Sequence, residues 1–172
     1  RCPLFTTASP DDLQDMAGHL RRRRFRRGEV IFHEDDPADA LHVVATGAVK
    51  IVLSSDEGEE AIIATLHPGD FFGELSLLDG SPRSATAVAV EATETLSLPR
   101  DTFLDALGRS PGLRDSLLRS LAGELRRLTG HVEELHFLDL SGRLASRLAR
   151  LARENVPGPQ RTDDGRLEAT LE

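Results

Sequence analysis

The stretch GDFFGELSLLDGSPRSAT, residues 69–86, decides how the rest of the chain is interpreted. Gly73 lets the backbone approach a ligand with no side chain in between. The residues that follow it favour a short helix, whose free N–H groups attract an anion. Arg83 adds a forked cation that suits phosphate, whereas Glu74 repels phosphate and suits a sugar hydroxyl. The stretch therefore predicts a site for one phosphate and one sugar.

This stretch resembles the phosphate-binding cassette of cyclic nucleotide-binding domains. Nearly the whole chain resembles the cyclic-AMP receptor protein/fumarate-nitrate regulator (CRP/FNR) family of bacterial transcription factors. The resemblance implies cyclic AMP as the effector, with cyclic GMP as the other candidate. It also implies a ligand-binding set: Gly73, Glu74, Leu75 and Ser76 at the cyclic phosphate and ribose, Arg83 and Ser84 at the phosphate oxygens, and Leu128 and Thr129 at the base. Of the last two, only Thr129 can hydrogen-bond an exocyclic amine.

Composition narrows the function classes. The 172 residues are enough for one domain with a core and an appendage. A net charge of −8 argues against nucleic-acid binding by this stretch itself. A single cysteine, Cys2, supplies neither a disulfide framework nor an iron–sulfur cluster. The sequence contains no apolar run near the roughly 20 residues that span a membrane and no leader. We therefore expect a cytoplasmic protein with no membrane partner.

Short β signals separated by glycines fill the first hundred residues, which is typical of a sandwich or barrel. The predicted strands are 30–32, 41–45, 48–53, 61–66, 85–90 and 95–98, and the predicted helices are 10–22 and 99–107. The resemblance implies a β-roll here. We expect an α+β fold: an antiparallel β-roll (a double-stranded β-helix, jelly-roll-like) with flanking helices and a long C-terminal dimerisation helix.

Two local features bear on this fold. At 34–36 relatives often have a glycine in the middle of the turn, but Asp35 tolerates turn geometry and should preserve it. The basic run at 21–27 surrounds a single aromatic residue, Phe25, which is no stacking platform for nucleic acid. We interpret the run as a solvated helix end and strand entry.

A long helix is predicted over 110–136, and its apolar residues alternate at spacings of three and four. This heptad seam consists of Leu118, Leu121, Leu125, Leu128, Val132 and Leu135. Such a seam favours a coiled-coil homodimer, which the resemblance also implies. The alternative is a helix that packs on the core of its own domain.

The predicted organisation has three parts: a nucleotide-binding β-roll domain over 1–109, the dimerisation helix over 110–137, and a hinge with the start of a truncated DNA-binding domain over 138–172. The resemblance implies a further partner, DNA, bound through a helix-turn-helix that is not present in this chain. The chain is thus interpreted as the sensing and dimerisation region of a transcription regulator.

Two alternatives remain from the sequence. One is a relative that keeps the fold but answers to no nucleotide. The other is a metal-dependent enzyme of the cupin class, for which His33, His42 and His67 are the candidate ligands. These histidines are scattered and form no His-x-His motif, and no Gly-x-Ser-x-Gly nucleophile motif occurs. We expect no catalytic residues, no metal and no cofactor.

Overall fold

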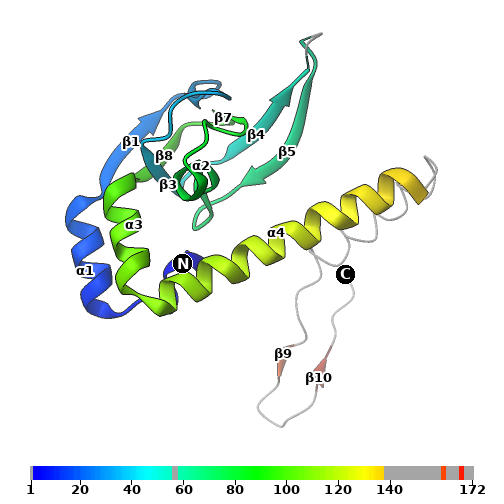
Figure 1. Ribbon diagram of the computed structural model, residues 1–172. Helices are drawn as coiled ribbons and strands as arrows, with labels where there is room; N and C mark the ends of the chain where they lie inside the picture. The colour runs from blue at the N-terminus through cyan, green and yellow to red at the C-terminus, as the bar shows by residue number, and fades with distance from the viewer. Residues whose placement is uncertain (1, 56–57, 138–159, 162–166, 169–172) are drawn as a thin grey trace. The chain divides into compact units, whose positions relative to one another are not determined.

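The computed structural model describes residues 2–55, 58–137, 160–161 and 167–168 (Figure 1). The chain forms two compact units, Arg1–Ala122 and Gly123–Glu172. Each unit is described by itself.

The described part of the first unit holds two four-stranded antiparallel sheets, so the predicted α+β fold is confirmed. The first sheet has the order β1 (Arg21–Phe25), β8 (Thr93–Pro99), β3 (Ala40–Thr46) and β6 (Phe71–Phe72). The second has the order β2 (Val30–Phe32), β7 (Thr86–Ala89), β4 (Val49–Ser54) and β5 (Glu60–Leu66). Neighbours in space are mostly distant in sequence, as in a β-roll.

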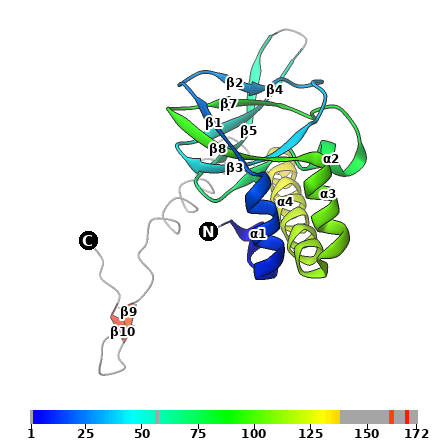
Figure 2. The ribbon, with the colours of Figure 1, turned by 90° about the vertical axis from the view of Figure 1, so that its left-hand side faces the viewer.

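The two sheets face one another across a small apolar core (Figure 2). Val44 and Phe72 from the first sheet pack there against Val49 and Ala87 from the second. Gly47 makes the tight turn from β3 to β4 with a φ of +81°. A Cβ at Gly47 would lie 2.6 Å from the carbonyl oxygen of Ala92, so only glycine fits.

A second core lies between the first sheet and the helices. It is lined by α1 (Pro10–His19), α3 (Arg100–Arg109) and the start of α4 (Pro111–Phe137), which lie side by side in Figure 2. Its fully buried members include Leu41, Leu98, Phe103 and Leu113. Because β3 is covered on both faces, its buried residues form a near-continuous run rather than an alternating one.

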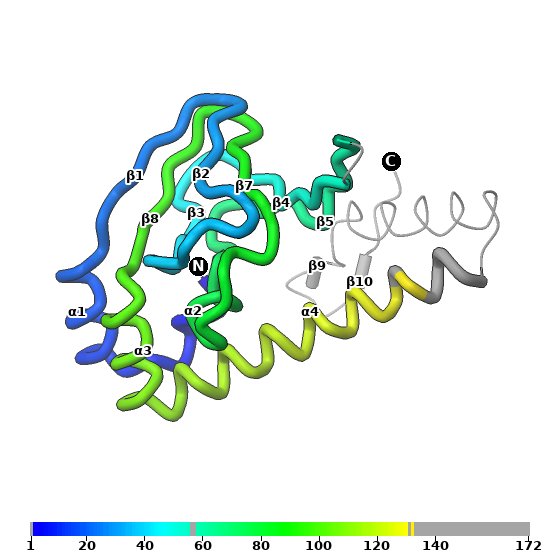
Figure 3. The backbone as a smooth tube through the Cα atoms, turned by 45° about the horizontal axis from the view of Figure 1, so that its top comes forward, coloured from blue at the N-terminus to red at the C-terminus, as the bar shows by residue number. Residues whose placement is uncertain are grey.

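The basic run is a strand, and the predicted helix over 10–22 is too long. Helix α1 ends at His19, and Leu20 is already extended with ψ at 132°. Arg21–Phe25 pairs antiparallel with β8 at the edge of the first sheet (Figure 3). Four consecutive arginines show no polar–apolar alternation, so the sequence carried no strand signal here. The short strand β6 was also missed.

Helix α4 agrees with the prediction in extent. Some of its apolar residues are buried in the core of its own domain, and others are exposed. Leu113 and Leu117 are buried in the helical core, and Leu121 packs against it. The alternative of a helix packed on its own domain is therefore right for the beginning of α4. The seam residues Leu118, Leu125, Leu128 and Val132 are exposed, and the side chain of Leu135 lies outside the described residues.

In the second unit, β9 (Gln160–Arg161) and β10 (Leu167–Glu168) form an antiparallel pair. The rest of the predicted hinge and truncated domain over 138–172 lies outside the described residues. The boundaries of the three predicted parts stay predictions.

Candidate functional site

The cassette forms the predicted turn and short helix. Strand β6 ends at Phe72, Gly73 turns the chain with φ at +82°, and α2 (Leu75–Asp79) follows at once. Gly80 ends the helix in the left-handed region, φ +76°. The buried Ser76 hydroxyl donates to the carbonyl oxygen of Pro82 at 3.0 Å, which fastens the helix to the segment leading into Arg83.

Arg83 is the central side chain of the site, because it is long, charged and only 2 % exposed. Its Nη1 donates to the carbonyl oxygen of Gly73 at 2.8 Å, and Nη2 donates to the carbonyl oxygen of Ala40 at 2.8 Å. Asp39 Oδ1 lies 3.5 Å from Nη2, and the guanidinium carbon stands 4.2 Å from the centre of the Phe32 ring. The guanidinium thus links the cassette to β2 and β3.

One donor of this buried group is left over. Arg83 Nε has no hydrogen-bond partner among the described residues. An unpaired buried donor costs about 1–3 kcal/mol, and burial also lowers the pKa of Arg83, against the opposing charges of Asp39, Asp36 and Glu74. The site therefore holds a positive charge that its protein surroundings compensate only in part.

Gly73 is required by the position of Arg83. A Cβ at Gly73 would lie 2.5 Å from Arg83 Nη1, and the positive φ strains any other residue. The backbone of Arg83 is held just as firmly from the other side. Its N–H donates to Asp36 O, and Asp35 N–H donates to Arg83 O, both at 2.9 Å. Asp35 itself has φ at +66°, so the predicted 34–36 turn is confirmed with aspartate in place of glycine.

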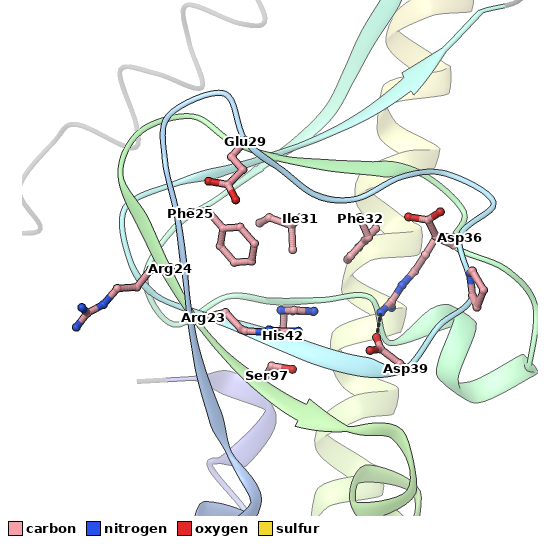
Figure 4. Close-up of a pocket in the computed structure, with 12 residues that line it drawn as sticks. Arg23, Arg24, Phe25, Glu29, Ile31, Phe32, Asp36, Asp39, His42 and Ser97 are labelled. Atoms are coloured by element: carbon pink, nitrogen blue, oxygen red, sulfur yellow. Dashed lines mark hydrogen bonds and ion pairs between the residues drawn. The ribbon is translucent and has the colours of Figure 1, made fainter.

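The structure brings the predicted cassette residues into one place. Gly73 and Arg83 touch directly, and Glu74 is half-buried close enough to act on the pKa of Arg83. Leu75 and Ser84 are exposed at the surface of the same segment. No motif in the sequence pointed to Phe32, Asp39 and Ala40, which meet Arg83 only because the roll folds β2 and β3 against the cassette (Figure 4).

The predicted base-reading residues, Leu128 and Thr129, lie in the second unit. Leu128 is exposed, and the Thr129 hydroxyl donates to Leu125 O of the same helix at 2.9 Å. Whether these residues meet the base stays a prediction.

The histidines of the cupin alternative do not gather. His33 and His67 are exposed, while His42 is buried with Nδ1 3.2 Å from the Thr95 hydroxyl. No three His, Cys, Asp or Glu side chains come together as a metal site in the described part of the chain. Nor does any described helix have the length and apolarity to cross a bilayer.

Comparison with known proteins agrees with this geometry. The family model "Cyclic nucleotide-binding domain" matches residues 22–110. The cyclic AMP receptor protein of Thermus thermophilus is 38 % identical over 157 residues, which are 91 % of this chain and 72 % of that protein. A CRP-like cAMP-activated global transcriptional regulator of Mycobacterium tuberculosis is 33 % identical over 88 % of this chain and 68 % of its own length.

The crystal structure of the Thermus thermophilus catabolite activator protein superposes with a TM-score of 0.70 and 38 % sequence identity, covering 91 % of this chain and 73 % of that one. The cassette, the two-sheet roll and these similarities lead to the same assignment. The chain belongs to the CRP/FNR family of transcription regulators and contains their cyclic nucleotide-binding domain.

Proposed function

We propose that this chain senses cyclic AMP for a transcription regulator, works as a homodimer and performs no chemistry. The observation that carries the proposal is the buried guanidinium of Arg83, which has an unpaired Nε–H beside the Gly73 turn. A guanidinium stays charged at any ordinary pH, so burial favours an anionic partner. A cyclic phosphate supplies both the negative charge and the missing acceptor.

The other cassette residues have separate roles in this proposal. Glu74 accepts a hydrogen bond from the ribose hydroxyl, because a carboxylate beside a phosphate needs a donor as its partner. Ser84 adds a hydroxyl at the phosphate, and Thr129 hydrogen-bonds the base. The names of the Thermus and Mycobacterium relatives support cyclic AMP as the nucleotide. Such a sensor works in the cytoplasm, and its output is DNA binding by the regulator to which it belongs.

Thermal unfolding tests the proposal directly. Cyclic AMP should raise the free energy of unfolding by about 2.7 kcal/mol at a hundredfold excess over Kd. Cyclic GMP and cyclic di-GMP, measured in parallel, should give smaller shifts at equal concentration. If none of the three changes the melting temperature, the sensor proposal fails and the nucleotide-independent alternative takes its place.

The dimer proposal rests on the exposed stripe of α4. Leu118, Leu125 and Val132 are more than half exposed, at 63 %, 66 % and 54 %, and Leu128 lies on the same stripe. Their spacing of seven, with Leu128 between, matches the positions that meet a second helix in a coiled coil. In a two-fold symmetric dimer, this stripe would pack against the same stripe on a second copy of the chain.

Leu125→Glu combined with Leu128→Glu should convert the dimer into monomers, because it places like charges in the seam. Leu121 is unsuitable for this test, since it packs on the core of its own domain. Arg119→Glu with Arg126→Glu is the matched control: it adds the same glutamates beside the seam and should stay dimeric. Sedimentation equilibrium measures the mass of each. An intact dimer in the leucine double variant would contradict an interface along α4.

A further inference from the structure

Residues 2–9, which we call the strap, lie against the junction of α3 and α4. Pro3–Phe5 form a single turn of 3₁₀ helix, and Leu4 is fully buried in the helical core. Cys2 and Phe5 are partly buried against the same core. Figure 1 shows the blue start of the chain beside the first turns of α4. The strap thus connects the beginning of α4 to the rest of its own domain.

Thr7 fastens the strap to two successive turns of α4. Its Oγ1 donates to the carbonyl oxygen of Gly112 at 2.6 Å and lies 2.5 Å from Ser116 Oγ. Because the Thr7 proton is used on Gly112, Ser116 is the donor of the second bond. Ser116 is only 7 % exposed although it is polar. The strap therefore supplies the partner that this buried hydroxyl needs.

The backbone of the strap approaches α4 so closely that only glycine fits at position 112. A Cβ on Gly112 would overlap the carbonyl oxygen of Thr7, which is a backbone atom and cannot rotate away. The φ of Gly112 is not positive, so the helix by itself would accept alanine, which is the better helix former. Contact with the strap, and not the conformation of α4, explains the glycine.

Further bonds hold the junction of the two helices. Ser110 is extended between α3 and α4, with φ at −107° and ψ at 102°. Arg114 Nη1 donates back to the carbonyl oxygens of Leu107 and Gly108, at 2.7 Å and 3.0 Å. The first turns of α4 are thus fixed both to the end of α3 and to the strap.

The strap holds α4 on the side opposite an exposed leucine. Gly112 and Ser116 are four residues apart and therefore share a face of the helix. Leu118 follows Ser116 by two residues, which is about 200° around an α-helix, and it is 63 % exposed. The strap consequently fixes the helix from behind and leaves the beginning of the exposed stripe uncovered.

The strap has few apolar contacts to keep it in place. Within the strap, all of which the structure describes, only Leu4 is fully buried, whereas Pro3, Thr6 and Thr7 are exposed. Segments with few buried apolar contacts open locally at a lower cost in free energy than the unfolding of the domain. Docking of the strap is therefore an equilibrium that other contacts of α4 can shift.

We propose that the strap is a conformational device that couples its own docking to dimerisation along α4. This inference rests on the homodimer proposed above. A docked strap fixes the first two turns of α4 and presents Leu118 to a second copy, whereas an open strap leaves these turns unfixed and weakens the dimer. Such coupling is reciprocal, so dimerisation should in turn keep the strap docked.

Cys2, the single cysteine of the sequence, reports the opening of the strap. Its side chain is partly buried against the helical core, and burial raises the pKa of its thiol. Dithiobis(nitrobenzoate) should therefore react with it mainly when the strap is open. The labelling rate is measured at protein concentrations that span dimer dissociation, which sedimentation equilibrium determines. We expect the rate in the wild type to fall about tenfold from monomer to dimer.

Gly112→Ala should open the strap, because its Cβ would meet the Thr7 carbonyl oxygen. Gly123→Ala is the matched control in the same helix, since a Cβ there meets nothing within 4 Å. Gly112→Ala should label about tenfold faster and have a dimer dissociation constant about tenfold higher. Gly123→Ala should label as the wild type does and dimerise at least as tightly. Alanine favours the helix at both positions, so helix propensity alone would strengthen both dimers.

Thr7→Val is a milder variant that keeps the test open if Gly112→Ala does not fold. It removes both hydroxyl bonds and should label about fivefold faster as a monomer, whereas Thr6→Val, which loses only a bond to Pro3 O within the strap, should not. Equal labelling of Thr7→Val and the wild type would overturn the proposal. So would an unchanged dimer dissociation constant in a Gly112→Ala protein that labels faster.

The concentration series separates this inference from the dimer on which it rests. A dimeric wild type whose labelling rate does not depend on concentration would contradict the coupling and leave the dimer intact. A wild type that stays monomeric throughout would contradict the homodimer, and the coupling with it.

Discussion

Arg83→Ala should weaken cyclic AMP binding by about a hundredfold or more. A charge-assisted hydrogen bond contributes roughly 1.5–3 kcal/mol, and a forked guanidinium can give a phosphate more than one. The loss should be similar for cyclic AMP and cyclic GMP, because both have the same cyclic phosphate. Isothermal titration calorimetry of the wild type and the variant measures it.

A second variant separates binding from folding, because Arg83 also holds the carbonyl oxygens of Gly73 and Ala40. Arg83→Lys keeps the charge but replaces the fork with a single ammonium group. It should fold and bind about tenfold more weakly than the wild type. Wild-type affinity in Arg83→Lys, or a folded Arg83→Ala that binds within a few-fold of the wild type, would contradict the phosphate role.

Glu74→Ala provides the contrast within the same cassette. Loss of the Glu74 carboxylate should leave the contacts with the phosphate in place and remove the contact with the ribose hydroxyl. The variant should therefore bind cyclic AMP and its 2′-deoxy analogue equally, while the wild type prefers cyclic AMP. A Glu74→Ala protein that discriminates as well as the wild type would show that the sugar is read elsewhere.

His42 should make the stability of the protein depend on pH in the mildly acidic range. Burial, together with the charges of Arg83 and Arg23 and against that of Asp39, lowers the pKa of His42 from 6.5 to about 4. Between these two values the unfolded chain binds a proton that the folded chain does not. The stability from neutral His42 is thus present above pH 6.5 and lost as the pH falls toward 4, by about 2 kcal/mol between pH 7 and pH 5.

Urea unfolding at pH 7 and pH 5 checks this expectation. The wild type should lose more stability than His42→Gln, which has no proton to gain at that position. His67→Gln serves as the control, because His67 is exposed and should behave as the wild type does. The same pH dependence in the wild type and His42→Gln would show that protonation of His42 does not cause the loss of stability.

The sequence predicted those parts of the structure whose signals are local. Glycines and β-branched runs marked six strands to within two residues at each end. Gly73 and Gly80 bracketed the cassette helix, and Arg83 stood out as the cation after it. A strand of arginines shows neither polar–apolar alternation nor β propensity, so β1 could not be predicted from the sequence. It forms because β8 offers it a pairing edge, which is a tertiary effect.

The surroundings of Arg83 could not be predicted for a related reason. Ala40 contributes only a backbone oxygen, which has no residue signature, and Phe32 contributes a ring from a strand some fifty positions away in sequence. Heptad spacing likewise could not separate the two roles of α4. Leu121 packs on its own domain while Leu118 is exposed. In a helix of 3.6 residues per turn, a face that packs on its own domain and a face that meets a second helix show the same spacing of apolar residues.

The arginine strand at the sheet edge has a consequence for solubility. An edge strand offers a row of N–H and C=O groups on which another chain can build, and this is how sheets aggregate. Arg21–Arg24 put four exposed arginines on the edge strand β1, pointing alternately to its two faces, and two of them, Arg22 and Arg24, pair with Glu94. A second copy that approached edge to edge would bring its own arginines against them, and one Glu94 per copy offsets only part of this positive charge. Repulsion between identical edges should thus keep this roll from polymerising edge to edge.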